Sequence, residues 1–197
     1  MPIRIKMNLH HIAQSAPHWA LWFAGHGWLA NPLVFWIPVY AAVANRYLRR
    51  AKFGKKFVKW LSPAGLGSTQ NQVLSAGVHS LVRWAAGFPE PEFVAVSEDW
   101  KVGEYLVGIV QNGMKPCVDT SPSAAVRLCL AMQERGISLR SVTFLLEGEP
   151  LTPSRRETIE AAGAKAVPTY GFSKGGNVGN QCPSPSAADD VHISLDA

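Results

Sequence analysis

The alternation of helix and strand patterns between Trp100 and Thr169 constrains the fold of this chain most strongly. Six elements are predicted in turn, helix first: 100–112, 115–120, 124–134, 142–146, 154–162 and 165–169. The stretch Val142–Leu146 is continuously apolar or β-branched, which suits a strand buried on both faces. Strands that alternate with helices form parallel sheets with crossover helices. We therefore predict an α/β fold with a mostly parallel sheet.

Capping residues support the last helix of this series. Thr152 is a favourable N-cap residue, and Pro153 falls at the first helical position, where a missing N–H is harmless. Gly163 follows the helix at the position where a left-handed glycine commonly ends one. The stretch from Val142 to Thr169 is thus predicted to be one β-α-β unit.

Three predicted loops follow the carboxyl ends of strands, namely Ser121–Ser123, Gly148–Pro150 and Tyr170–Ser173. Ligands of open parallel sheets bind beyond the carboxyl ends of the strands. We therefore expect these three loops to lie on one side of the sheet and to be candidates for a binding site.

The remaining segments are less regular. Apolar patterns predict a buried strand, Leu33–Ile37, and three helices over 9–24, 39–50 and 71–86. Residues after Gly176 are predicted to form a loop-rich tail with a last strand over 191–195. Turns or loops are expected at 87–91 and 62–69, the latter without the spacing of a phosphate-binding loop. The 197 residues suggest one domain, with 1–99 and 100–197 as two portions of it.

Charge and cysteine usage exclude several classes of protein. The net charge of +5 is carried mainly by basic residues at 46–50 and 52–59, which we interpret as a solvated helix end rather than a nucleic-acid surface. The apolar run 28–43 is broken by Asn31, Pro32 and Pro38 and is too short to span a membrane. Three widely spaced cysteines favour a reducing, cytoplasmic location, with Cys129 in the core.

Two groups of residues raise the question of a metal. His10, His11, His18 and His26 lie near the N-terminus, but Pro17 disturbs their helical register and no acid or cysteine accompanies them. Cys182 and His192 are usual zinc ligands, yet they are only two. A structural role is the favoured interpretation of both groups.

One resemblance rests on motifs that occur in order. Gly148-Glu-Pro-Leu151, Tyr170-Gly-Phe-Ser173, Cys182 and Asp190-Val-His192 together resemble the adenylate-forming superfamily, and most closely its phenylacetate–CoA ligase-like members. The resemblance extends from about Lys115 to Ala197 and more loosely from the N-terminus. It implies that the chain is an internal segment of the large domain of such an enzyme.

The resemblance also implies a chemistry. Enzymes of this family join a carboxylic acid to the α-phosphate of ATP with the help of Mg²⁺, and many pass the acyl group to CoA or a carrier protein. Gly148, Glu149 and Pro150 would form a wall beside adenine, and Tyr170 would pack on the purine. Gly171 would allow close approach, and Phe172 and Ser173 would border the phosphate and acyl end.

This chain departs from the family pattern in three ways. Lys174 stands where a glutamate usually helps to hold Mg²⁺, and lysine offers no oxygen ligand, although it could contact phosphate. The phosphate loop and the C-terminal domain with its catalytic lysine are also missing. We therefore expect little or no activity of the chain alone.

Two alternatives stay open at this point. The chain is either part of an ATP-dependent ligase that activates a carboxylic acid, or a decayed, non-catalytic adenylation fold that binds a partner or a small carboxylate or does nothing. The purely structural interpretation of Glu149 and Tyr170 is a hydrogen-bonded glutamate of a β-α turn and a packed tyrosine. We also expect that exposed apolar surface and sheet edges promote self-association.

Overall fold

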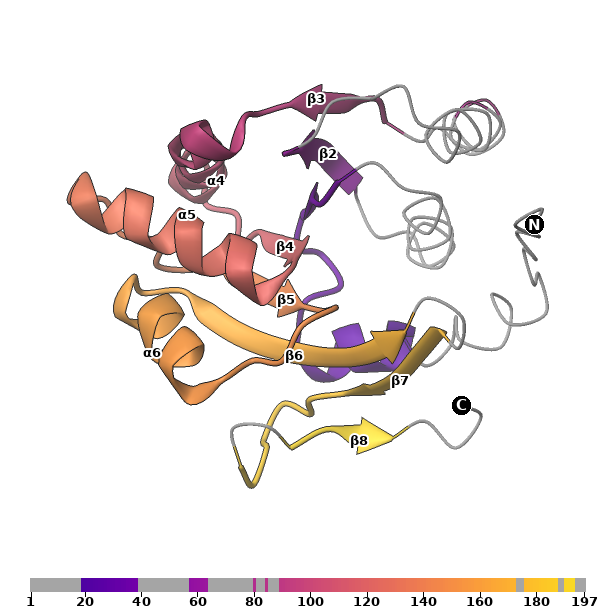
Figure 1. Ribbon diagram of the computed structural model, residues 1–197. Coiled ribbons are helices and arrows are strands. Elements are labelled where there is room, and N and C mark those ends of the chain that lie inside the picture. Colours follow the sequence, from indigo (N-terminus) through magenta and orange to yellow (C-terminus); the bar gives the residue numbers. More distant parts are fainter. Residues whose placement is uncertain are drawn as a thin grey trace, which may run out of the picture.

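The structure is a computed structural model, and it describes residues 19–38, 57–63, 80, 84, 89–172, 176–187 and 190–193. Its centre is an eight-stranded sheet in the order β3-β2-β1-β4-β5-β6-β7-β8 (Figure 1). The strands are β1 Leu33–Trp36, β2 Phe57–Ser62, β3 Pro91–Phe93, β4 Cys117–Thr120, β5 Thr143–Leu146, β6 Lys165–Phe172, β7 Gly176–Asn180 and β8 His192–Ile193. Pairing is parallel from β3 to β6 and antiparallel from β6 to β8. The predicted α/β fold with a mostly parallel sheet is confirmed.

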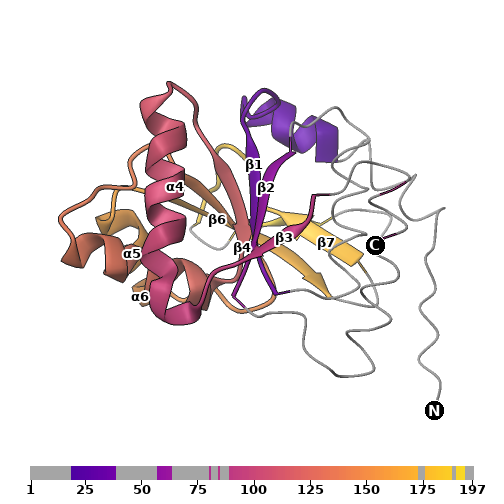
Figure 2. The ribbon, with the colours of Figure 1, turned by 90° about the horizontal axis from the view of Figure 1, so that it is seen from above.

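Helices cover both faces of this sheet. Three of them, α4 Asp99–Gln111, α5 Pro122–Glu134 and α6 Pro153–Ala161, lie together on one face, and the short 3₁₀ helix η1 Val96–Glu98 leads into α4 (Figure 2). Helical residues 19–25 lie on the other face. Each of the helices α4, α5 and α6 connects one parallel strand to the next, which is the crossover arrangement that the sequence predicts.

The central strands are buried on both faces. Val34, Val118 and Phe144 point into a core with the helices α4–α6, whereas their neighbours Leu33 and Leu145 are equally buried on the other side. All four residues of β1, β4 and β5 are buried. A strand without a solvent-facing side has no need of alternating polar residues, which is why β1 is an apolar run and β5 is apolar apart from Thr143, whereas β4 buries Asp119 and Thr120 as well.

Close helix packing contributes to the same core. Gly103 on α4 lies directly against the buried side chain of Met132 on α5, and a Cβ atom at Gly103 would overlap it. The two helices can approach this closely because Gly103 has no side chain.

The predicted helix caps are present. The Thr152 hydroxyl accepts a hydrogen bond from the Arg155 N–H at 3.4 Å, and Pro153 is the first residue of α6. Gly163 has a φ of +87° just past the end of that helix. The side chain of Ser121 caps α5 in the same way, accepting from the Ala124 N–H at 3.3 Å.

Four predictions for individual segments are wrong. The basic stretch around Lys59 contains β2, and the predicted turn near Pro91 begins β3. Lys59 fits a strand because its ammonium reaches Glu92 of β3 at 2.6 Å. The predicted loop at Tyr170 continues β6, and the predicted loop-rich tail contains β7. These two strands pair through backbone groups, so glycine and asparagine suffice in β7 and no apolar alternation reveals it.

On the second face, aromatic side chains form a compact group of Trp19, Trp22, Phe23 and Trp28. The indole N–H of Trp22 donates to the Gln181 carbonyl at 2.6 Å, and a ring nitrogen of His26 lies 3.0 Å from the same oxygen. This contact fixes the stretch after β7 against the helical residues 19–25. The aromatic residues therefore serve as core.

Several predictions fall outside the described residues: the helix at 39–50, most of the helices at 9–24 and 71–86, most of the loop at 62–69, and His10, His11 and His18. Within the described ranges, no helix is long and apolar enough to cross a membrane.

Candidate functional site

The order of the strands reverses direction next to β1. The chain passes from β1 to β2 and β3 on one side, and then returns to build β4, β5 and β6 on the other. The carboxyl ends of β1 and β4 thus lie at a topological switch point, which is where ligands bind in open α/β sheets.

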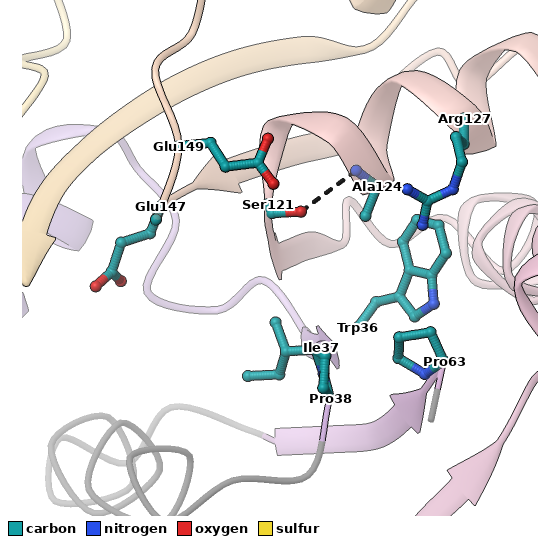
Figure 3. A pocket seen from close by; sticks show the side chains of 10 residues that line it. Trp36, Ile37, Pro38, Pro63, Ser121, Ala124, Arg127, Glu147 and Glu149 are labelled. Carbon is teal, nitrogen blue, oxygen red and sulfur yellow. Dashed lines mark hydrogen bonds between the residues drawn. The ribbon is translucent and has the colours of Figure 1, made fainter. Parts of the chain in front are cut away.

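A cavity of about 240 Å³ lies at this switch point (Figure 3). Trp36, Ile37 and Pro38 line it from the end of β1, and Pro63 follows β2. The N-terminal half of α5 and the loop after β5 complete the lining with Ser121, Ala124, Arg127, Glu147, Gly148 and Glu149. Two of the three loops expected to share this edge, those after β4 and β5, therefore meet at one cavity.

Gly148 shapes the loop after β5. Its φ of +91° lies in the left-handed region that glycine adopts without strain, and a Cβ atom there would meet nothing within 4 Å. The backbone conformation, rather than steric crowding, therefore favours glycine at this position.

Glu149 is the centre of a small polar network. Its Oε2 accepts hydrogen bonds from the backbone N–H of Ser123 at 3.2 Å, from the hydroxyl of Ser123, and from Nη1 of Arg155 at 3.0 Å. Arg155 also donates to the Pro150 carbonyl at 2.9 Å. The network joins the start of α5, the start of α6 and the loop between β5 and α6, and it fixes one edge of the cavity.

The same contacts set the charge state of Glu149. The hydrogen bond from the Ser123 side chain, together with the backbone N–H of Ser123 and the charge of Arg155, lowers the pKa of this carboxyl below its usual value. Partial burial acts in the opposite direction but is outweighed. Glu149 is therefore a stable anion at neutral pH.

Tyr170 of β6 and Gly148 both follow the last paired residues of β5 and β6. Leu146 pairs with Pro168, and Gly148 and Tyr170 each follow two residues later. Tyr170 is 62% exposed and is not part of the cavity wall. The structure thus brings the two motifs to one edge of the sheet, and the Tyr170 side chain is not packed in the core.

The other predicted site residues have different surroundings. Gly171 and Phe172 belong to β6 and pair with Asn177 and Gly176 of β7 instead of forming a loop. Ser173 and Lys174 lie outside the described residues.

Sequence reasoning did not identify the other side of the cavity. Trp36 and Arg127 line it, and Asp99 supports Arg127 from the start of α4 through a contact of 3.1 Å between Oδ2 and Nε. Asp99 is only 3% exposed, and burial raises the pKa of its carboxyl, a rise that Arg127 partly offsets. Acidic residues are common at the start of helices, so Asp99 alone does not indicate a site. The sequence does not show that Asp99 contacts Arg127, because the two residues lie on different helices.

The metal hypothesis receives no support from the part of the chain that is described. That part contains no group of three or more His, Cys, Asp or Glu side chains able to hold a metal ion. Cys182 is half-buried with a free thiol, and His192 is an exposed residue of β8.

Comparisons with known proteins give little further information. No family model matches the chain. No curated protein matches it. Among solved structures, the crystal structure of IdnL1 is similar with a TM-score of 0.32 and 13% identity, over 93% of this chain and 58% of that one. The chain thus spans 58% of the length of IdnL1, and a likeness at this level carries no argument about fold or function.

Proposed function

We propose that this chain is part of an ATP-dependent ligase that activates a carboxylic acid as its adenylate. The observation that carries the proposal is the position of the loop Gly148–Pro150. This loop borders the cavity at the switch point and follows strand β5, and the 62% exposed Tyr170 lies on the adjacent strand β6, two residues beyond its last pairing with β5. Such an edge provides one surface for a purine and a neighbouring cavity for the acid.

The roles of the residues follow from this arrangement. Tyr170 is the proposed stacking partner of adenine, since the residue is 62% exposed, and the backbone of Gly148 and Glu149 forms the wall between nucleotide and acid. Glu149 acts mainly by holding this wall in place, because its Oε2 is engaged by Ser123 and Arg155. ATP and Mg²⁺ are the proposed cofactors, with Lys174 contacting phosphate where a magnesium ligand would otherwise stand. CoA or a carrier protein would accept the acyl group, and the chain alone is inactive or weakly active.

Nucleotide binding tests the proposal. Titration of the chain with AMP and with ATP should give saturable binding. Binding should weaken in Tyr170→Ala, because the stacking surface is lost. It should also weaken in Glu149→Ala, because the loop Gly148–Pro150 loses the hydrogen bonds of Glu149 to Ser123 and Arg155. Controls are Tyr105→Ala on α4 and Glu157→Ala at an exposed position of α6, since neither residue lines the cavity. Equal affinity of all five proteins for AMP would contradict the proposal.

A second candidate is a non-catalytic binding module that retains the fold of such an enzyme. The observation favouring it is that Ser123, Glu149 and Arg155 hydrogen-bond to one another. Glu149 therefore has hydrogen-bond partners without a bound ligand. Lys174→Glu distinguishes the two. If it creates Mg²⁺-dependent affinity for ATP where the natural chain has none, the chain carries a decayed nucleotide site.

A further inference from the structure

The cavity at the switch point has two chemically distinct sides. Trp36, Ile37, Pro38 and Ala124 provide an apolar surface, and Glu147 and Gly148 mark the edge nearest the proposed nucleotide site. Figure 3 shows Arg127 and Trp36 on the other side of the cavity from Glu147. A ligand lying across the cavity therefore meets the loop after β5 at one end and Arg127 at the other.

The far side offers a hydrogen-bond donor that the described part of the chain does not fully use. Arg127 donates through Nε to Asp99, and its terminal nitrogens form no further hydrogen bond within the described part of the chain. The Trp36 side chain, which is 1% exposed, adds apolar surface to this side. A guanidinium group donates only, so an oxygen acceptor is the complementary group.

Asp99 preorganises the Arg127 side chain for binding. The Asp99 carboxylate is almost fully buried and holds Nε of Arg127 at 3.1 Å, while 42% of the Arg127 side chain stays exposed. An arginine fixed through one edge presents the remaining edge to a ligand at a smaller loss of side-chain entropy than a free one.

We propose that the cavity selects a small carboxylic acid with an apolar body and a second oxygen acceptor at its far end, which Arg127 binds. The cavity of about 240 Å³ is smaller than the roughly 300–1,000 Å³ typical of drug-sized ligands, so a short acid fits it. The acid lies with its reacting carboxylate towards Gly148 and its distal oxygen at Arg127. This inference rests on the proposed function and specifies its substrate class.

Two acids of equal chain length test the inference. Hexanoate has an apolar end, whereas adipate carries a second carboxylate at the same position. Binding of each to the full chain is measured by ligand-observed NMR titration without nucleotide. We expect adipate to bind about tenfold more tightly than hexanoate, the size of effect typical of a charge-assisted hydrogen bond.

Substitutions assign the preference to Arg127. In Arg127→Met the two acids should bind equally. Arg127→Lys keeps a cation beside Asp99, and should retain the fold while losing most of the preference, since lysine cannot bind Asp99 and the acid through separate edges. Arg135→Met is the matched control, because Arg135 follows the same helix but lies over the ring of Trp100, 4.3 Å from its centroid.

The outcomes separate this inference from the function on which it rests. Equal binding of the two acids to the natural chain, absence of any binding, or a preference that survives Arg127→Met would overturn the inference. Loss of AMP binding with the adipate preference intact would instead overturn the proposed function alone.

Discussion

At the scale of single residues, Glu149 links stability to the candidate site. Its lowered pKa means that the folded chain holds the proton less tightly than the unfolded chain does. The resulting stability is fully present above the unfolded pKa of 4.5 and is lost as the pH falls through the folded value. The effect is within about 1 kcal/mol, because the Glu149 side chain is 35% exposed and water screens its pairing with Arg155.

Glu149→Gln should therefore lower the free energy of unfolding at pH 7 but not at pH 3. Urea denaturation of both proteins at the two pH values measures this difference, with Glu157→Gln as the control for removal of a carboxylate elsewhere. A deficit of the same size at both pH values would show that lost packing, rather than lost charge, destabilises the variant.

The three cysteines should differ in reactivity. Cys117 and Cys129 are completely buried, and burial raises the pKa of the Cys129 thiol to about 12, whereas Cys182 is half-buried. Because the thiolate is the reactive form, a thiol reagent should modify Cys182 alone in the folded chain and all three cysteines in urea. Mass spectrometry of tryptic peptides identifies the labelled residue, and rapid labelling of Cys129 in the folded state would contradict the structure.

At the scale of elements, the segment from Asp99 to Lys165 was largely predictable. Strands such as Thr143–Leu146 are continuous apolar runs because both faces are buried, and helix α6 begins and ends with recognisable capping residues. Both signals are local in the sequence, so no knowledge of distant contacts was needed to find them.

The strands that were missed depend on distant partners. Lys59 sits in β2 because Glu92 of β3 and the ring of Tyr105 lie next to it, neither of which is near in sequence. Strand β7 is Gly176–Asn180, and its backbone pairs with β6 without any apolar pattern. The cavity wall was only half predictable for the same reason, since Trp36 and Arg127 come from elements more than 80 residues apart.

Packing of α4 against α5 gives a prediction for two glycines of the same helix. Gly103→Ala should destabilise the chain by about 1–3 kcal/mol, because the new methyl group overlaps the buried Met132 side chain. Gly108→Ala should stabilise it by about 0.5–1 kcal/mol, since no atom lies within 4 Å and alanine favours the helix. Thermal denaturation compares the two variants, and equal effects of the same sign would contradict the described packing.

At the scale of the whole molecule, the sheet ends in β3 and β8, and each of these edge strands carries an exposed apolar residue. Phe93 of β3 is 58% exposed, and Ile193 of β8 is 70% exposed. An edge strand with apolar side chains is a template for pairing with another chain. We therefore predict that the chain associates with itself through β3.

Phe93→Lys should reduce this association, because a charged edge strand resists pairing. Sedimentation velocity over a range of concentrations measures the change. Leu130→Lys is the control, since Leu130 is a similarly exposed apolar residue on helix α5. A natural chain that is monomeric at all concentrations, or a Phe93→Lys variant that still associates, would contradict the prediction.

The whole molecule also indicates where a ligand should bind, because the strand order reverses beside β1 and the loops after β4 and β5 meet at a cavity there. The central claim is that this edge binds adenine against Tyr170. Photolabelling with 2-azido-ATP, followed by peptide mapping, tests it most directly. We predict that the tryptic peptide 166–174, which contains Tyr170, is labelled and that excess ATP prevents this labelling. The labelling should be lost in Tyr170→Ala. Labelling confined to other peptides, or none that excess ATP prevents, would contradict it.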